Sequence, residues 1–404
     1  MTDALNPRDA VILSAARTPV GTFGGVYRDF DALSLAVEAS KAAVERSGIG
    51  LDAIDEIIFG SGGQPIEFAC IARQIGLKLG APLSVPAYAV QRNCASGVQS
   101  ISNAVQSIAV GDGDIYLVGG TENMSMAPYY IPAEASRWGA RLRHRQLLDA
   151  NWIGLTDYHT GILMGETAEI VADKFGITRE MQDAFALESH NKAFRAQRMG
   201  KFADEMIAVH VPKKHGEPET VAKDEGPQAG LSVQKLSLYP AVFRKGGSVT
   251  PGNSCPMSDA GCALVVASAQ KAQALGLKPL ARIRSYGFAG CDPQTMGLGP
   301  TVSTPIALKK AGLTMDQIDL IEFNEAFAAQ YLACEQIMEI DRAKVNVNGG
   351  AIALGHPIGA TGSRLVTTLM HELRRQGKRF GLATMCVGGG QGGSLIVENM
   401  EAAA

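Results

Sequence analysis

AVERSGIGLDAIDEIIFGS, at residues 43–61, returns as ALKKAGLTMDQIDLIEFNE at residues 307–325. Aligned without a gap, the two stretches are identical at seven of nineteen positions and are offset by 264 residues. In both copies an amphipathic helical pattern stops at a glycine, Gly48 or Gly312, which suits the left-handed residue that ends a helix. A short turn with Asp then leads into an apolar run of strand type. The chain therefore contains one helix–turn–strand unit twice.

The repetition extends beyond these stretches. A helical segment, VQSISNAVQSIAVGDG, precedes the apolar run DIYLVGG in the first part of the chain. In the last part, SRLVTTLMHELRRQG precedes the apolar run in FGLATMCVGG in the same way. Helices and strands that alternate at this spacing predict βαβ crossovers, largely parallel sheets and helices on both faces. The fold class predicted is therefore α/β, built from two similar halves.

The segment between the two halves has a different composition. It carries most of the histidines, a charged helical stretch (ITREMQDAFALESHNKAFRAQRMG) and polar, Gly-containing segments such as KKHGEPETVAKDEGPQAG. Long insertions in α/β enzymes form lids or binding loops. We predict an N-terminal half at 1–121, an inserted α+β loop domain at 122–269 that recognises a ligand, and a C-terminal half at 270–404.

The repeat relates Cys94 to His356. Adding the offset to Cys94 gives Ile358, two positions from His356. Each of the two follows an apolar strand and precedes a helix, so the equivalent loops of the two halves can meet near a pseudo-twofold axis. A Cys–His pair at such a junction is a candidate activated nucleophile. The start of the helix after Cys94 adds positive partial charge, which favours the thiolate.

Composition excludes several classes of function. The chain is 46% apolar and 19% charged with a formal net charge of −3, so it lacks the basic excess of a nucleic-acid-binding protein. We expect no membrane span, because no apolar run approaches 18 residues. The seven cysteines form no CxxC pair and no metal-ligand spacing with histidine, so we expect no metal site. The N-terminal composition matches no signal or transit peptide, so we expect a cytoplasmic protein.

Five segments in order resemble the signature segments of the thiolase family. They are RNCASGVQS, VGGTENMSMAP, FNEAFAAQ, NVNGGAIALGHPIGATGSR and CVGGGQGG, and the resemblance covers essentially the whole chain, insertion included. It implies the thiolase fold, a layered α-β-α-β-α core of duplicated halves. It is strongest to the acetyl-CoA acetyltransferase branch, which interconverts two acetyl-CoA with acetoacetyl-CoA plus CoA through an acyl-cysteine. It also implies a role in fatty acid metabolism and a homotetramer built as a dimer of dimers.

The resemblance implies a role for each catalytic residue. Cys94 is the nucleophile, and His356 in the GHP motif activates it and then helps to hold the thioester oxygen. Cys386 is the second acid/base, which acts on the α-proton of the second acetyl-CoA. Asn324 orients a water in the oxyanion site that it shares with His356. The backbone N–H groups of Cys94 and Gly388 hold the second oxyanion, and glycine permits close approach.

The glycine run GGGQGG (388–393) also fits the letters of GxGxxG, but a dinucleotide site requires a helix after the glycines. The strand-like segment SLIVE follows instead. We therefore predict a backbone-rich turn beside the active site.

Coenzyme A is expected as a substrate and product, with no tightly bound cofactor and no nucleic-acid partner. By resemblance, seven residues line the acyl pocket or border the pantetheine channel: Met164, Phe243, Cys255, Met257, Met296, Ala326 and Phe327. Two departures bear on the acyl chain. Position 163 is Leu where many acetoacetyl-type members have His, and Cys255 and Pro256 stand where a Ser–Gly pair is common.

Three alternatives stay open at this point. One is a degradative thiolase that acts on longer 3-ketoacyl-CoA chains. Another is a decarboxylating ketoacyl synthase, which has His at the position of Asn324 and lacks the second active-site cysteine. The third is a non-catalytic acyl-CoA carrier on the same fold, which loss of a catalytic residue would favour. All four catalytic side chains are present.

Overall fold

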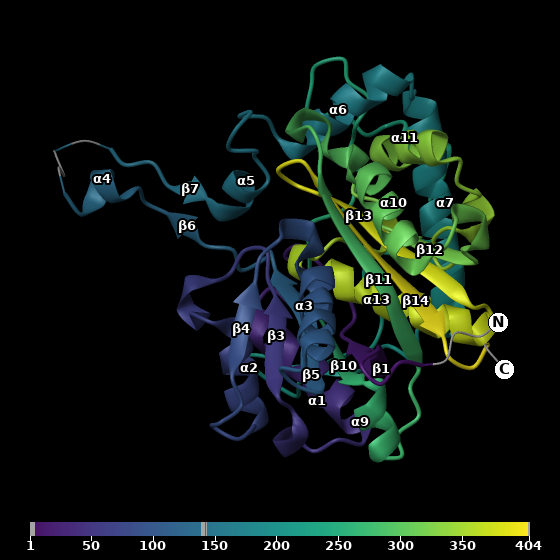
Figure 1. Cartoon of the computed structure of the whole chain (residues 1–404). Coiled ribbons are helices and arrows are strands. Elements are labelled where there is room, and N and C mark those ends of the chain that lie inside the picture. The colour runs from purple at the N-terminus through teal and green to yellow at the C-terminus, as the bar shows by residue number, and fades with distance from the viewer. Residues whose placement is uncertain (1–4, 139–141, 143, 403–404) are drawn as a thin grey trace.

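The computed structural model describes residues 5–138, 142 and 144–402. Its main sheet has the strand order β12-β13-β14-β11-β1-β10-β5-β3-β4, with β2 paired to β10 (Figure 1). The strands are β1 (Ala10–Arg17), β2 (Gly21–Thr22), β3 (Glu56–Gly60), β4 (Ala87–Val90), β5 (Ile115–Asn123), β10 (Ser258–Ser268), β11 (Ala281–Gly290), β12 (Leu320–Phe323), β13 (Phe380–Val387) and β14 (Gln391–Asn399).

The strand order is symmetric about the β1–β11 pair. On one side of it lie β10, β5 and β3, and on the other lie β14, β13 and β12, with β4 as an additional edge strand beside β3. The repeated stretches occupy equivalent places, since the first ends in β3 and the second in β12. At the centre the two halves meet through an antiparallel pairing of Val11 with Arg282 and of Ile12 with Ala281. The predicted duplication is confirmed.

Helices form three layers around the two halves of the sheet. The inner layer contains α3 (Ser96–Val110) and α13 (Ile358–Gln376), which pack on each other and on strands of both halves. Their apolar residues form one core cluster with β3, β5, β10, β13 and β14. The outer layers are α1 (Ala32–Ser47) and α2 (Ile71–Leu79) on one side, and α10 (Gly299–Ala311) and α11 (Ala328–Met338) on the other. This is the predicted α-β-α-β-α core.

Glycines end the helices of the repeated unit as predicted. The helix α1 begins after Asp31, whose side chain accepts a hydrogen bond from the N–H of Ser34, and ends at Gly48 with φ 72°. The equivalent helix α10 ends at Gly312 with φ 66°. Both glycines are in the left-handed region, where a residue without a Cβ meets little steric penalty. Equivalent 3₁₀ turns follow, Leu51–Ala53 and Met315–Gln317.

The prediction of largely parallel sheets was wrong. The parallel pairs of the main sheet are β3–β4, β3–β5 and β12–β13, and the other pairs are antiparallel. In the second half, β13 turns back directly into β14 through a glycine-rich turn. In the first half, β10 returns from the insertion and lies antiparallel between β1 and β5. A short hairpin or a returning strand pairs antiparallel without a crossover helix.

The insertion ends earlier in the structure than the predicted boundary at 269. Strand β10 belongs to the main sheet, so the inserted part lies between β5 and residue 258. Its elements are β6 (Tyr129–Tyr130), α4 (Ala133–Ser136), β7 (Leu148–Asp149), α5 (Ala150–Gly154), α6 (Met164–Phe175), α7 (Arg179–Arg198), β8 (Val209–Val211), β9 (Glu219–Val221) and α8 (Val233–Leu236). The apolar run of β10 alone did not indicate that it pairs with strands of the first half.

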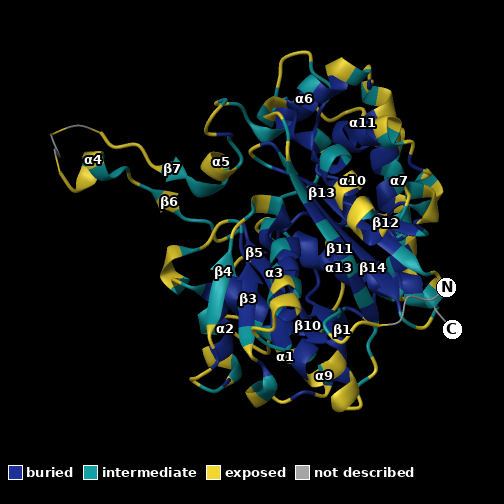
Figure 2. Cartoon of the chain, viewed as in Figure 1, coloured by how far each residue is buried: buried dark blue, intermediate teal, exposed yellow. Residues whose placement is uncertain are grey.

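Part of the insertion forms an arm that projects from the molecule. The arm contains β6, α4 and β7, and Figure 1 shows it extending well beyond the layered core. Figure 2 shows its residues as exposed or intermediate, in contrast to the buried central strands. Its large apolar side chains include Tyr129, Trp138 and Leu147, each about 60% exposed. In the described part of the chain, no helix combines the length and hydropathy that crossing a membrane requires.

Three short elements complete the C-terminal half. The helix α9 (Ala269–Ala274) follows β10, and the 3₁₀ segment Pro293–Leu298 leads into α10. The short helix α12 (Ala351–Leu354) ends just before His356, and α13 begins just after it.

Candidate active site

Cys94 lies in a short 3₁₀ turn, Asn93–Ala95, between strand β4 and helix α3. The turn is tight because Asn93 has a positive φ of 42°. The Ser96 side chain closes it, accepting from the N–H of Arg92 at 2.9 Å and donating to the carbonyl of Asn93 at 2.7 Å. The predicted position of Cys94, after a strand and before a helix, is confirmed.

Burial raises the pKa of the Cys94 thiol to about 11. Hydrogen bonds from the backbone N–H groups of Gly388 and of Cys94 itself lower this pKa, and the nearby Glu122 carboxylate raises it. We expected the start of α3 to favour the thiolate. The backbone N–H groups act in that direction, but in the resting protein the loss of hydration outweighs them. Cys94 is therefore a thiol at neutral pH and needs a base.

His356 occupies the turn between α12 and α13. Its Nδ1 lies 2.7 Å from Oγ1 of Thr361, and that hydroxyl donates its single proton to the carbonyl of Pro357 at 2.9 Å. The hydroxyl must therefore accept a hydrogen bond from Nδ1–H, which leaves the lone pair on Nε2. Burial and, to a smaller extent, the Arg364 guanidinium lower the pKa of His356 to about 3. The ring is a neutral base whose free nitrogen is Nε2.

Asn324 stands beside this nitrogen. It follows β12, is fully buried, and its Nδ2 lies 3.5 Å from Nε2 of His356. Its backbone N–H donates to the carbonyl of Thr384 on β13, which fixes the residue against the sheet. Its Oδ1 has no hydrogen-bond partner among the described residues. Asn324 does not itself line the cavity described below, but it contacts His356, which does.

Cys386 and Gly388 come from the end of β13. The antiparallel partner of Val387 is Gln391, so the glycines between them form the turn into β14. Gly389 and Gly390 have φ of 88° and 81°, which only glycine adopts easily. This confirms the predicted glycine-rich turn. Cys386 is buried, and burial holds its pKa well above the usual value of a thiol.

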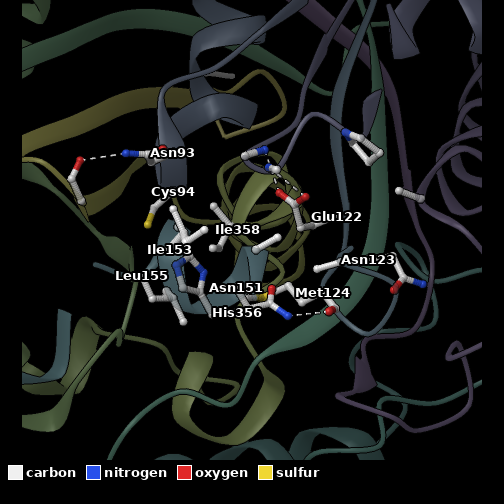
Figure 3. A pocket seen from close by; sticks show the side chains of 18 of the residues that line it. Asn93, Cys94, Glu122, Asn123, Met124, Asn151, Ile153, Leu155, His356 and Ile358 are labelled. Atoms are coloured by element: carbon white, nitrogen blue, oxygen red, sulfur yellow. Dashed lines mark hydrogen bonds between the residues drawn. The ribbon is translucent and has the colours of Figure 1, made fainter. Parts of the chain in front are cut away.

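One cavity of about 550 Å³ brings these groups together. Cys94, His356, Cys386 and Gly388 all line it, and Figure 3 shows Cys94 and His356 among the side chains that surround it. The two halves of the chain therefore meet here, as the repeat predicted. A thiol from one half stands with a neutral imidazole and a second thiol from the other, a set suited to acyl transfer and proton transfer.

The expected coenzyme A contacts divide into two groups. Five of them line the cavity: Met164, Cys255, Met296, Ala326 and Phe327. Phe243 does not line it and packs behind it, with its ring edge-on to Phe327 at 6.2 Å between centroids. Met257 also lies outside the lining, where its backbone bridges to His356 and accepts from the N–H of Phe23. Sequence spacing alone could not separate residues that face the cavity from those that support its wall.

Glu122 is a site residue that the sequence reasoning missed. It lies at the end of β5, is buried, and lines the cavity. Its carboxylate accepts hydrogen bonds from the N–H groups of Gly62 at 2.7 Å, Gly63 at 3.1 Å and Gly359 at 2.9 Å. Figure 3 shows Glu122 among the side chains that line the cavity. It thereby joins the loop after β3 to the start of α13. A lone acidic residue that ends an apolar strand was the only signal in the sequence.

Comparison with known proteins decides the family. The family model described as "Thiolase, N-terminal domain" matches residues 10–270, and "Thiolase, C-terminal domain" matches residues 277–399. The chain belongs to the thiolase family. This thiolase is 46% identical to an acetyl-CoA acetyltransferase of Pseudomonas aeruginosa, over 96% of this chain and 99% of the relative.

Solved thiolase structures agree with the fold. The acetyl-CoA acetyltransferase of Bacillus anthracis matches with a TM-score of 0.95 and 43% identity, over 97% of this chain and 99% of that one. Human mitochondrial 3-ketoacyl-CoA thiolase in complex with CoA matches with a TM-score of 0.94 and 41% identity, over 98% of each chain. The present thiolase is thus similar both to acetyl-CoA acetyltransferases and to a thiolase named for 3-ketoacyl-CoA.

Proposed function

We propose that this thiolase catalyses the reversible reaction of two acetyl-CoA to acetoacetyl-CoA plus CoA, through an acyl intermediate on Cys94. One observation carries the proposal. Cys94 from the first half of the chain shares a single cavity with His356 and Cys386 from the second half. The acetyl-CoA acetyltransferases among its relatives support the choice of substrate.

In the first half-reaction, Cys94 gives its proton to Nε2 of His356 as its sulfur attacks the thioester carbonyl. The tetrahedral intermediate then collapses, and the bond between the carbonyl carbon and the sulfur of coenzyme A breaks. The departing thiolate takes the proton back from His356 and leaves as CoA, while the acyl group stays on Cys94. Nε2 suits both steps because the Nδ1 proton is engaged with Thr361.

In the second half-reaction, Cys386 passes its thiol proton to Nε2 of His356, and the resulting thiolate removes a proton from the α-carbon of a second acetyl-CoA. The enolate carbon attacks the acyl carbonyl on Cys94, the carbon–sulfur bond breaks, and acetoacetyl-CoA forms. The Cys94 sulfur leaves as a thiolate and takes the proton from Nε2 of His356, so that both cysteines end as thiols and the imidazole ends neutral. Because burial raises the pKa of Cys386 well above its usual value, its thiolate is a strong base once formed.

Two sets of hydrogen-bond donors stabilise the negative charge that develops on oxygen. The backbone N–H groups of Cys94 and Gly388, which face the Cys94 sulfur, serve the tetrahedral oxyanion. The other site holds the thioester oxygen of the enolate: its donor is Nε2–H of His356 while that nitrogen carries the proton received from Cys386, and Asn324, 3.5 Å from Nε2, supports it. Donors fixed in advance need no reorganisation during the reaction, and one such donor contributes about 3 kcal/mol in measured cases.

Coenzyme A acts as substrate and product rather than as a resident cofactor. The wall formed by Met164, Met296, Ala326 and Phe327 is apolar, which suits the methylene groups of a pantetheine arm and a short acyl chain. The CoA complex of the human mitochondrial relative supports binding of this ligand. In the described part of the chain, no group of three or more His, Cys, Asp or Glu residues is placed to hold a metal ion.

A degradative 3-ketoacyl-CoA thiolase is the second candidate, favoured by the apolar lining of the cavity. A further part of the cavity wall is apolar. That wall comprises Phe68, Met126, Tyr130, Ile153, Leu155 and Ile358. A chain longer than acetyl would pack there. A non-catalytic carrier gains no support, because all four catalytic side chains are present and close to the cavity.

We further propose that the thiolase is a homo-oligomer, a dimer of dimers, which acts in fatty acid metabolism in the cytoplasm. The arm supports an oligomer, since it presents Tyr129, Trp138 and Leu147 to solvent on a thin projection, where apolar surface is unfavourable unless a partner covers it. Sedimentation as a monomer at micromolar concentration would refute the oligomer. The cytoplasmic location rests on the amino-acid sequence alone.

Steady-state kinetics test the proposed reaction. We expect a ping-pong pattern for thiolysis of acetoacetyl-CoA, with parallel lines in double-reciprocal plots against CoA. Cys94→Ser should lower kcat by at least about 10³-fold, because a serine hydroxyl is a far weaker nucleophile beside the same base. Intersecting lines, or turnover by Cys94→Ser close to that of the wild type, would overturn the covalent mechanism.

A further inference from the structure

Asn93, the residue before the nucleophile, holds an unfavourable backbone conformation. Its φ is 42°, in the left-handed region, and four other non-glycine residues share a positive φ in the described part of the chain. Asparagine tolerates this region better than other residues with a side chain, and glycine tolerates it best. A site that needed only the turn would be served by glycine. The side chain therefore has to be accounted for separately.

The side chain of Asn93 crosses from one half of the molecule to the other. Its Nδ2 donates to the carbonyl oxygen of Gly388 at 2.9 Å, a bond drawn as a dashed line in Figure 3. Asn93 is exposed and lines the same cavity as Cys94 and Gly388. The bond thus lies at the edge of the reaction site.

The neighbouring Arg92 reinforces the same connection. Its Nη1 donates to Oε1 of Gln391 at 2.7 Å, and its guanidinium lies over the ring of Phe288 at 4.4 Å. Two consecutive residues of the nucleophile turn therefore hold the two ends of the glycine-rich turn from β13 to β14. Between those ends lie Gly389 and Gly390, whose backbone has little conformational restraint of its own.

Gly388 is thereby held at both of its backbone polar groups. Its carbonyl accepts from Asn93, and its N–H faces the sulfur of Cys94. A Cβ on Gly388 would come within 3.6 Å of Nδ2 of Asn93 and 3.3 Å of the Met164 sulfur, so the turn is already closely packed. If the Asn93 bond is lost, the peptide that carries this carbonyl can rotate about the Cα of Gly388, and the adjoining peptide that carries the N–H loses a restraint on its orientation.

We propose that Asn93 is a positioning residue that aims the Gly388 N–H at the Cys94 sulfur and at the oxyanion that forms on the acyl group. The inference rests on the proposed function, since the oxyanion belongs to that reaction. Asn93 contributes by holding the carbonyl side of Gly388, and thereby restrains the adjoining peptide that donates the hydrogen bond. It makes no bond to the substrate and transfers no proton.

Three variants separate the backbone from the side chain. Asn93→Gly keeps the left-handed turn and removes the amide. Asn93→Asp is nearly isosteric, but its carboxylate faces the Gly388 carbonyl and repels it. Gln106→Ala is the matched control, because Gln106 also joins the two halves through an amide, donating to Tyr286 Oη at 2.7 Å on the surface outside the cavity lining.

We expect Asn93→Gly and Asn93→Asp to slow acetylation of Cys94 by about 10- to 100-fold, somewhat less than the loss of a whole oxyanion donor. KM should change less than twofold, and the thermal midpoint of Asn93→Gly should match that of the wild type. Gln106→Ala should acetylate at the wild-type rate. Wild-type kcat in Asn93→Gly, or a loss confined to KM, would overturn the proposal.

A substrate-free measurement keeps this test independent of the proposed function. The rate of Cys94 alkylation by iodoacetamide is followed against pH, with the labelled peptide identified by mass spectrometry. Because the Gly388 N–H stabilises the thiolate, its displacement should move the Cys94 profile to higher pH in Asn93→Gly and Asn93→Asp. An unmoved profile in both variants would overturn the positioning role. Absence of acetylation in the wild type would instead refute the proposed function and leave this profile to decide the role of Asn93.

Discussion

Nδ1 of His356 donates a hydrogen bond to Oγ1 of Thr361 across 2.7 Å, and the Thr361 hydroxyl in turn donates a hydrogen bond to the carbonyl of Pro357. One hydroxyl thus fixes which nitrogen of the catalytic imidazole carries the proton. The free lone pair lies on Nε2, the nitrogen nearest to Asn324. Since a neutral histidine can serve as a base only through its unprotonated nitrogen, this contact decides the direction of proton transfer.

Replacing Thr361 should therefore impair proton transfer. We expect Thr361→Val to lower kcat about 10- to 100-fold with little change in KM, because the ring loses the acceptor that holds its tautomer. Thr361→Ser retains the hydroxyl and should restore most of the activity. Nitrogen NMR of labelled histidine would report the tautomer directly. A single Nε2-unprotonated tautomer in Thr361→Val would contradict this account of the contact.

The acid limb of the pH profile should lie far below neutrality. His356, with a pKa lowered to about 3, stays neutral above that pH and can accept a proton. Cys94, with a pKa raised to about 11, stays a thiol below that pH. Both partners keep their starting states across pH 5 to 9, so the rate of Cys94 acetylation should be flat there. Rapid-mixing measurements with acetyl-CoA would test this, and a limb near 6.5 would show a histidine of ordinary pKa.

Cys386 should be dispensable for one half-reaction and required for the other. Cys386→Ala should still accept an acetyl group on Cys94, since that step uses His356 as the base. It should fail to exchange the α-protons of acetyl-CoA with deuterated water, because the group that removes the α-proton is gone. Exchange at the wild-type rate in Cys386→Ala would remove Cys386 from the second step. Cys291→Ala is the control, since that half-buried cysteine lies outside the cavity lining.

Glu122 should contribute to stability and also modulate the nucleophile. In Glu122→Gln, one of the backbone N–H groups of Gly62, Gly63 and Gly359 loses its acceptor, so the free energy of unfolding should fall by about 1–3 kcal/mol in urea titration. The Glu122 carboxylate also raises the pKa of Cys94, so its removal should shift Cys94 alkylation to lower pH. That shift is opposite in sign to the one expected for Asn93 variants. Unchanged stability and an unchanged alkylation profile would show that Glu122 has neither effect.

The fold could be predicted from the sequence to the extent that local patterns repeat. The glycines at 48 and 312, the apolar runs and the 264-residue offset indicated two equivalent halves, and the halves placed Cys94 near His356. Strand direction was not available in the same way. An apolar strand such as β10 has the same sequence pattern whether its neighbouring strands are parallel or antiparallel to it. The direction of the strand depends on the side of the sheet from which the chain re-enters it.

Site residues could be predicted from the sequence where the residue type itself indicates catalysis. Residues that act through their position in the folded structure were predicted less well. Cysteine and histidine in glycine-rich loops were visible in the sequence. Thr361, Glu122 and Asn93 act through contacts that only the folded chain brings together, and their residue types are common elsewhere in the sequence. The resting state of Cys94 was also missed, because burial is a property of the assembled cavity.

Mapping the acyl group to a peptide shows whether the reaction passes through Cys94. The protein is mixed briefly with acetoacetyl-CoA and, separately, with 3-ketooctanoyl-CoA, quenched in acid, and its peptides are examined by mass spectrometry. We predict an acetyl group on the Cys94 peptide from acetoacetyl-CoA, and a hexanoyl group there from 3-ketooctanoyl-CoA would extend the substrate range to longer chains. An adduct on another cysteine, or none from either thioester, would contradict a covalent mechanism through Cys94.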